Sequence, residues 1–103
     1  MTTISVQENC FIRLESIYAH VNAAFRARLV GVPDAVDGVN VAFSGDAVAP
    51  NTAAECVATP GGDWTFTIPA AAFTAAGRAI FSVYALIGTD NYFLGSGTVF
   101  VED

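Results

Sequence analysis

The sequence has no lysine, and its four arginines stand against ten acidic residues, which gives a formal net charge of −6. A nucleic-acid partner is therefore not expected, because binding to a phosphate backbone depends on clustered Lys and Arg side chains. Charged residues are scarce overall, at 14% of the chain, against about 25% in an average soluble domain. Few groups are available to keep a large surface hydrated.

Histidine and cysteine are also rare: the chain has one histidine, His20, and two cysteines far apart in the sequence, Cys10 and Cys56. Zinc sites need clustered Cys and His ligands, and a catalytic triad needs a nucleophile and an acid beside the histidine. Ser96 lies in Gly95-Ser96-Gly97, which lacks the Gly-x-Ser-x-Gly spacing of a nucleophile elbow. We therefore expect no catalytic residue, no metal site and no cofactor, and read the two glycines as a bulge or a close approach in the last strand.

Four aspartates in turn-like segments offer a weak alternative, a calcium site at one end of the fold. They are Asp34, Asp37, Asp63 and Asp90. Asp in such segments more often closes an Asx-turn through its own backbone, and we favour that interpretation.

The first residues, Met1 to Gln7, lack the basic and apolar regions of a secretory signal. We therefore expect the protein to stay in the cytoplasm of the producing cell or to be released without the Sec route, with both cysteines reduced, although a Cys10–Cys56 disulfide remains an alternative. The nearly uncharged stretch from Pro69 to Gly88 is interrupted by Arg78, so we expect no membrane span.

Apolar residues, in contrast, are abundant: 53% of the chain is hydrophobic, including eight Phe, three Tyr and one Trp. A chain of 103 residues forms one domain, here 1–103, that buries only about 60 to 65% of its unfolded surface. We therefore expect some apolar surface to be covered by other chains, in a homo-oligomer or a larger protein assembly. A monomer with an alanine-rich surface is the alternative.

The segment from Glu8 to Val30 fits two periodicities. Its apolar residues are compatible with a helical stripe, but every second residue from Ile17 to Leu29 is apolar, and Arg26 and Arg28 fall on the other side. We favour a strand whose arginines point away from the core.

Further alternating or apolar runs are separated by turn residues. The runs are Val39–Ser44, Asn51–Thr59 as a weak edge strand, Trp64–Ile68, Arg78–Ile87 and Tyr92–Val101. Arg78–Ile87 is apolar on both faces, which is typical of a central strand. Six or seven short strands with Gly, Pro and Asp turns predict an all-β, antiparallel two-sheet sandwich.

Three segments carry a resemblance to a known class of module. They are Gly62–Pro69 followed by Phe73 and Gly77, Gly31–Pro33 followed by Gly38–Phe43, and the closing Leu94–Glu102. Together they resemble the immunoglobulin-like modules of bacterial and phage proteins, although Arg78-Ala79-Ile80-Phe81 replaces the Tyr that usually follows the Gly in those modules. The resemblance implies a single immunoglobulin-like β-sandwich of about seven strands that is displayed or assembled, as in a phage tail, fibre, baseplate or decoration protein.

Three aromatic residues are candidates for an interface. Tyr92 and Phe93 are adjacent, so in a strand they face opposite sides and one of them points away from the core. Trp64 could stack on a partner or a sugar ring, although an inward Trp commonly anchors such sandwiches and we favour that role. Two functions remain: a non-enzymatic assembly module that docks or self-associates through an apolar sheet face, or a carbohydrate- or protein-binding adhesion module that uses loops at one end.

Overall fold

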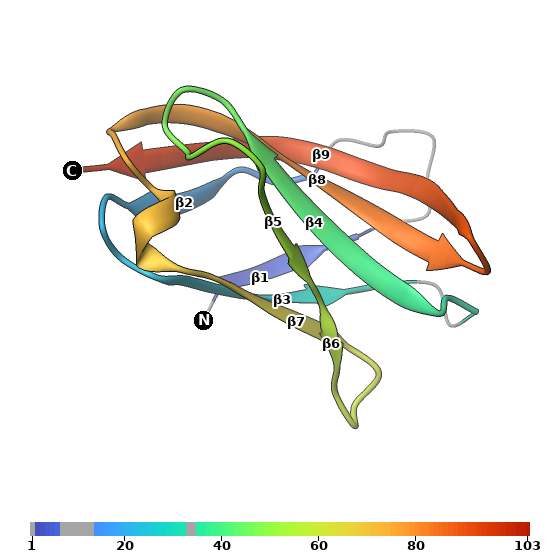
Figure 1. The fold of residues 1–103 in the computed structure, drawn as a ribbon. Coiled ribbons are helices and arrows are strands. Elements are labelled where there is room, and N and C mark those ends of the chain that lie inside the picture. Colours follow the sequence, from blue (N-terminus) through green and yellow to red (C-terminus); the bar gives the residue numbers. More distant parts are fainter. Residues whose placement is uncertain (1, 7–13, 33–34) are drawn as a thin grey trace.

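Two β-sheets pack against each other in the computed structural model, which describes residues 2–6, 14–32 and 35–103 (Figure 1). The first sheet has the order β1-β3-β7-β6 and the second the order β2-β9-β8-β4-β5. The bounds are β1 Thr2–Ser5, β2 Ile17–His20, β3 Phe25–Val30, β4 Gly38–Ser44, β5 Thr52–Glu55, β6 Val57–Ala58, β7 Trp64–Ile68, β8 Gly77–Ile87 and β9 Asp90–Glu102, with a short 3₁₀ turn η1 at Ala70–Ala72. The predicted all-β sandwich is confirmed.

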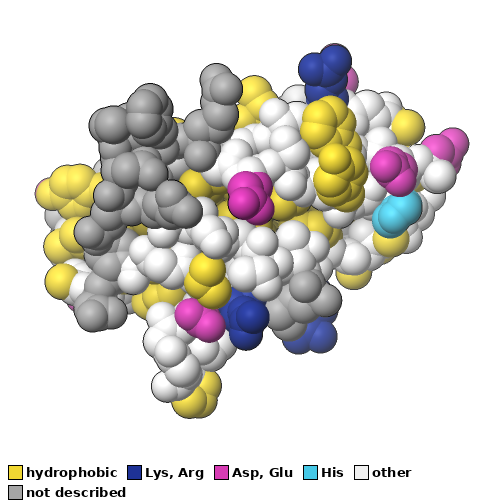
Figure 2. Space-filling model, turned by 180° about the vertical axis from the view of Figure 1, so that it is seen from behind, with side chains coloured by type: hydrophobic (Ala, Val, Ile, Leu, Met, Phe, Trp, Pro, Cys, Tyr) yellow, Lys and Arg dark blue, Asp and Glu magenta, His cyan; other side chains and the backbone are white. Residues whose placement is uncertain are grey.

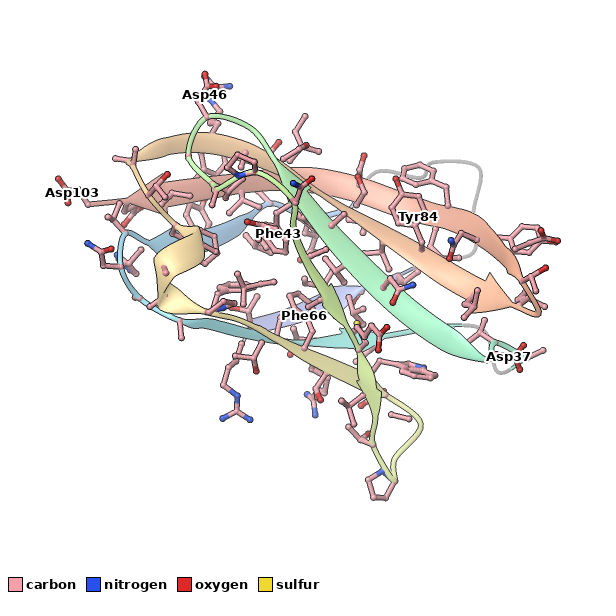
Figure 3. All side chains as sticks on the ribbon, in the orientation of Figure 1. Asp37, Phe43, Asp46, Phe66, Tyr84 and Asp103 are labelled. Atoms are coloured by element: carbon pink, nitrogen blue, oxygen red, sulfur yellow. The ribbon has the colours of Figure 1, made fainter. Side chains whose placement is uncertain are left out.

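The core lies between the sheets and is made by alternate residues of each strand. In β3 the residues Phe25, Ala27 and Leu29 are buried while Arg26 and Arg28 are exposed. Phe43 of β4 sits among four other phenylalanines, with ring centroids 6.1 to 6.4 Å away: Phe25, Phe66, Phe73 and Phe81. Phe43 and Phe66 come from opposite sheets and meet in the interior (Figure 3), so the two layers share one aromatic core.

The prediction of one strand from Ile17 to Leu29 is wrong in one respect. The chain turns at residues 21–24, so β2 joins the five-stranded sheet and β3 the four-stranded one. Asn22 adopts a left-handed conformation with φ of 57°, which Asn tolerates better than most residues. The turn spans an even number of residues, so the buried set continues in the same alternation and both strands point inward. The alternation of apolar residues alone could therefore not reveal the turn between β2 and β3.

Pairing at the sheet edges also differs from the predicted antiparallel arrangement. β1 pairs with β3 and β2 pairs with β9 in parallel, whereas the other pairs are antiparallel. The weak strand predicted over Asn51–Thr59 divides at Cys56 into β5 and β6, which lie at the edges of different sheets. With β1, which the sequence did not predict, the described residues contain nine strands instead of about seven.

Both effects expected of the glycines in the last strand are present. The register between β8 and β9 shifts at Val83/Tyr84, opposite Gly95. A Cβ at Gly97 would lie 2.7 Å from a ring carbon of Phe81 and 2.9 Å from the carbonyl oxygen of Glu15. The missing side chain thus leaves room for the Phe81 ring in the core.

Candidate docking surface

The outer faces of the two sheets differ sharply in chemistry. Outward residues of the four-stranded sheet are mainly small and polar or basic: Thr3, Arg26, Arg28, Thr65 and Thr67. The five-stranded sheet instead turns large apolar side chains outward: Tyr18, Ile80, Tyr84, Phe93 and Phe100. We call these five residues the outer apolar face.

The exposed fractions of the side chains confirm this contrast between the outer faces of the two sheets. Tyr18 is 61% exposed, Ile80 54% and Phe93 42%, while Phe100 and Tyr84 are half-buried. Val57 is the exposed large hydrophobic residue described on the four-stranded sheet, at 66%. Figure 2, a view from behind, shows a strip of hydrophobic side chains next to a basic side chain and near the single histidine. Large exposed apolar groups gathered on one face are typical of a surface that another molecule covers.

The outer apolar face is ordered into two aromatic pairs. Tyr18 and Phe100 are register partners whose rings stack with centroids 5.5 Å apart and planes 25° apart. Tyr84 and Phe93, also register partners, have centroids 5.7 Å apart. Small residues separate the pairs along the strands, with Ser82 opposite Ser96 and Ala42 beside Ser82. The two aromatic pairs therefore project from the outer apolar face, and the surface between them is lower where the side chains are small.

Two shallow hollows lie on either side of Arg78, the arginine among the described residues of this face. One, of about 460 Å³, is bounded by the Tyr18–Phe100 pair and by Glu102. The other, of about 390 Å³, is bounded by Ile80, Thr98 and the Ser44–Asp46 turn. Both are open depressions suited to projecting side chains of a partner.

The three interface candidates chosen from the sequence do not come together. Phe93 belongs to the outer apolar face, as expected for one of the two adjacent aromatics. Tyr92 lies opposite Ala85 and is also 51% exposed. Trp64 pairs with Leu29 on the inner side of the four-stranded sheet and packs half-buried against the core. Trp64 thus occupies the anchoring position favoured above.

The sequence analysis did not select Tyr18, Ile80 or Phe100 as interface candidates. The signal was present in β8, whose run is apolar on both faces and was interpreted as central. β8 is indeed the middle strand of its sheet, but its second face has no layer above it among the described residues. A doubly apolar strand in an antiparallel sheet can mark an uncovered face as well as a buried one.

The aspartates considered as ligands of a calcium site make separate contacts. Asp37 accepts a hydrogen bond from the backbone N–H of Gly88 at 2.7 Å, and Asp63 lies 3.9 Å from Arg28. Asp34 is outside the described residues, and within the described part no three His, Cys, Asp or Glu side chains gather as metal ligands. Asp37 thus contacts a loop residue 51 positions away and Asp63 faces an arginine of β3, so these two contacts are not the Asx-turns that the sequence suggested.

Cys56 is half-buried between β5 and β6, and its backbone N–H donates to the carbonyl of Val39 at 2.8 Å. Desolvation by burial raises the pKa of its thiol to about 12. The residue is therefore a neutral thiol at ordinary pH and a poor nucleophile. Cys10, the partner considered for a disulfide, lies outside the described residues.

An open groove of about 500 Å³ lies at the side where β2 and β3 diverge. Tyr18, His20 and Arg26 contribute polar groups to it, and Ala23 and Phe25 contribute apolar ones. His20 and Arg26 are both exposed. These groups can donate hydrogen bonds to a ligand but do not form a catalytic arrangement.

Comparison with known proteins gives a match in structure but not in sequence. No protein-family model matches the chain, and no curated protein sequence matches it. Among solved structures, the N-terminal domain of phage TP901-1 ORF48 superposes with a TM-score of 0.57 at 15% identity, over 99% of this chain and 98% of that one. The two chains share a fold. The agreement extends over the whole of both, so the sandwich described above occurs as a domain of a phage protein.

The described residues contain no helix with the length and apolar character needed to cross a membrane.

Proposed function

We propose that this chain is a non-enzymatic structural module of a phage virion or appendage, which docks through the outer apolar face of its five-stranded sheet. The observation that carries the proposal is the contrast between the two sheets. One has a polar outer face, and the other exposes two aromatic pairs and Ile80. The phage domain of the same fold supports the virion context.

An immunoglobulin-like sandwich is part of the proposal. The order β3-β7-β6 in one sheet and β9-β8-β4 in the other corresponds to the B-E-D and G-F-C strands of that fold. β5 then extends the second sheet at the position of the additional strand of variable-type domains. The parallel β1–β3 pair is a departure from the purely antiparallel scheme.

Incorporation into particles tests this function. A tagged copy of the chain, expressed during infection by the phage that encodes it, should co-purify with density-purified virions. An Ile80→Asp variant should be lost from the particles, because a carboxylate on the docking face would be buried without a partner. The matched control, Val57→Asp, changes a more exposed residue on the other sheet and should be retained. Virions that lack the wild-type chain would refute the proposed function.

Adhesion to a carbohydrate or protein is the second candidate. It is favoured by Tyr92, which is half exposed near the tip of the β8–β9 hairpin, and by the groove beside His20 and Arg26. Binding on a glycan array that is lost with Tyr92→Ala or Arg26→Ala would support it. An array without signal would leave assembly as the better function.

A further inference from the structure

A row of four outward side chains crosses the five-stranded sheet at the Tyr84–Phe93 pair. The strand registers place Phe93 of β9 opposite Tyr84 of β8. On the other side of Tyr84 lies Asn40 of β4, which is itself opposite Glu55 of β5. The residues before and after Tyr84 and Asn40 are buried, so these two side chains point away from the core. We call Phe93, Tyr84, Asn40 and Glu55 the cross-strand row, which spans three strand spacings, or about 14 Å.

One half of the cross-strand row is aromatic and the other half is polar. The rings of Tyr84 and Phe93 have centroids 5.7 Å apart, and Asn40 lies half-buried beside Tyr84. Asn91 shares this face because it precedes Phe93 by two residues on β9. With Asn40 and Tyr84 it borders a hollow of about 180 Å³. The side-chain hydrogen bonds found between described residues lie elsewhere in the fold, so the polar groups of the row are open to a ligand.

We propose that the cross-strand row binds a neutral saccharide. A sugar ring has an apolar C–H face and a rim of hydroxyl groups, each of which both donates and accepts hydrogen bonds. Tyr84 and Phe93 provide an aromatic surface for the apolar face. The amides of Asn40 and Asn91 carry donors and acceptors, and the ionised carboxylate of Glu55 accepts hydrogen bonds, so these groups suit the hydroxyl rim. Apolar side chains with a few placed polar groups are the usual composition of a small-molecule site.

Other classes of ligand fit this row less well. β8 and β4 each have a paired strand on both sides, so an extended peptide finds no free backbone edge there. An anionic ligand, such as a nucleic acid or a uronic acid, would meet the carboxylate of Glu55. Arg78, the arginine among the described residues of this face, is six residues from Tyr84 along β8, or about 20 Å, and the net charge of −6 adds to the repulsion. The row therefore favours an uncharged ligand that is rich in hydroxyl groups.

The inference goes beyond the proposed function, whose test rests on Ile80. Ile80 is four residues from Tyr84 along β8, or about 13 Å. Ser82 and Ser96 occupy the outward positions between them. A saccharide on the cross-strand row would therefore leave Ile80 accessible to a protein partner.

The probe is a glycan array of neutral and acidic oligosaccharides, to which the full chain is applied. The neutral glycan that binds best is then titrated into the wild type and the variants by isothermal titration calorimetry. Tyr84→Ala should weaken binding about tenfold, because one stacking ring is lost. Asn40→Ala should weaken it about three- to tenfold, the effect of one lost hydrogen bond. Glu55→Gln should narrow the preference for the neutral glycan over its uronic-acid analogue, because the repelling charge is removed.

Tyr18→Ala is the matched control. It removes the same side chain from the other aromatic pair of the outer apolar face and should bind the glycan like the wild type. Far-ultraviolet circular dichroism of each variant checks that the sandwich is intact. An array without a neutral hit, a preference for acidic glycans, or binding that survives both Tyr84→Ala and Asn40→Ala overturns the proposal. Binding that is lost only with Tyr92→Ala or Arg26→Ala also overturns it, because the glycan then lies at the site of the second candidate function.

Incorporation into virions separates this inference from the proposed function. A chain that binds the glycan but is absent from virions overturns only the proposed function. A chain that is found in virions but binds no neutral glycan overturns only this inference. Loss of Tyr84→Ala from the particles would in that case assign the cross-strand row to the protein partner.

Discussion

Gly31 is the residue at which the fold leaves least room for a side chain. Its φ of +79° is in the left-handed region, and a Cβ there would lie 2.2 Å from the carbonyl oxygen of Val6. Gly62 has a similar φ of +88° but nothing within 4 Å of the same position. Alanine substitutions at Gly31 and Gly62 therefore separate the energetic cost of the backbone conformation, which both share, from the cost of a steric clash, which applies to Gly31 alone.

We expect Gly31→Ala to lower the free energy of unfolding by about 3 kcal/mol or more, because both costs apply. Gly62→Ala should lose only about 1 kcal/mol, the backbone cost. Urea unfolding followed by the fluorescence of Trp64 measures both values. Equal losses would show that the approach to Val6 relaxes without cost.

At the residue scale, the sequence predicted orientation better than exposure. Alternation correctly turned Arg26 and Arg28 outward and Phe25 inward, because the pleat of a strand fixes this locally. It could not indicate that Tyr18 and Ile80 remain uncovered. Exposure depends on which elements lie above a face, and no residue near these two in the sequence carries that information.

The turn between β2 and β3 decides which sheet each strand joins. Its backbone is held by hydrogen bonds from Val21 to the carbonyl of Glu102 and from Asn22 to the carbonyl of Phe73, at 2.9 and 3.1 Å. Asn22 is left-handed at this point, with φ of 57°. The switch between sheets therefore rests on one conformationally demanding residue.

Asn22→Val should lower the free energy of unfolding by about 1 to 2 kcal/mol, because a β-branched residue disfavours positive φ. Asn22→Gly should be close to neutral. Asn91→Val, in strand β9 and without positive φ, is the control for the change in polarity and should cost little. Thermal unfolding by circular dichroism distinguishes them, and equal midpoints for the two valine variants would contradict this account.

At the element scale, the positions of strands with clear alternation or long apolar runs were predicted well, but the partners of the strands were not. Trp64–Ile68 has the predicted bounds, and β8 and β9 extend theirs by one or two residues at an end. The parallel pairing of β2 with β9 joins residues such as Ile17 and Val99. No local pattern encodes such a contact, because parallel neighbours need no shared turn.

The whole molecule depends on the aromatic core that links its two layers. Phe43 of the five-stranded sheet contacts Phe25 and Phe66 of the other sheet and also Phe73 and Phe81. Removal of this ring would leave a cavity against both layers at once.

Phe43→Ala should therefore lower the free energy of unfolding by about 3 to 5 kcal/mol. The matched variant Phe93→Ala removes the same ring from the outer apolar face and should cost far less stability, since Phe93 is 42% exposed. Urea unfolding provides the comparison. A similar loss from both variants would mean that the outer face stabilises the fold as much as the core does.

The parallel β2–β9 pair has a consequence for how the protein is made. Ile17–His20 leave the ribosome well before their hydrogen-bonding partners, Val99–Glu102, because the whole of β3 to β8 is synthesised between them. Nascent chains can begin to fold as they emerge, yet this margin of the five-stranded sheet cannot form until β9 has been synthesised. During that interval Ile17 and Ala19 lack their native neighbours, so a chaperone that shields short apolar segments would find its binding site here.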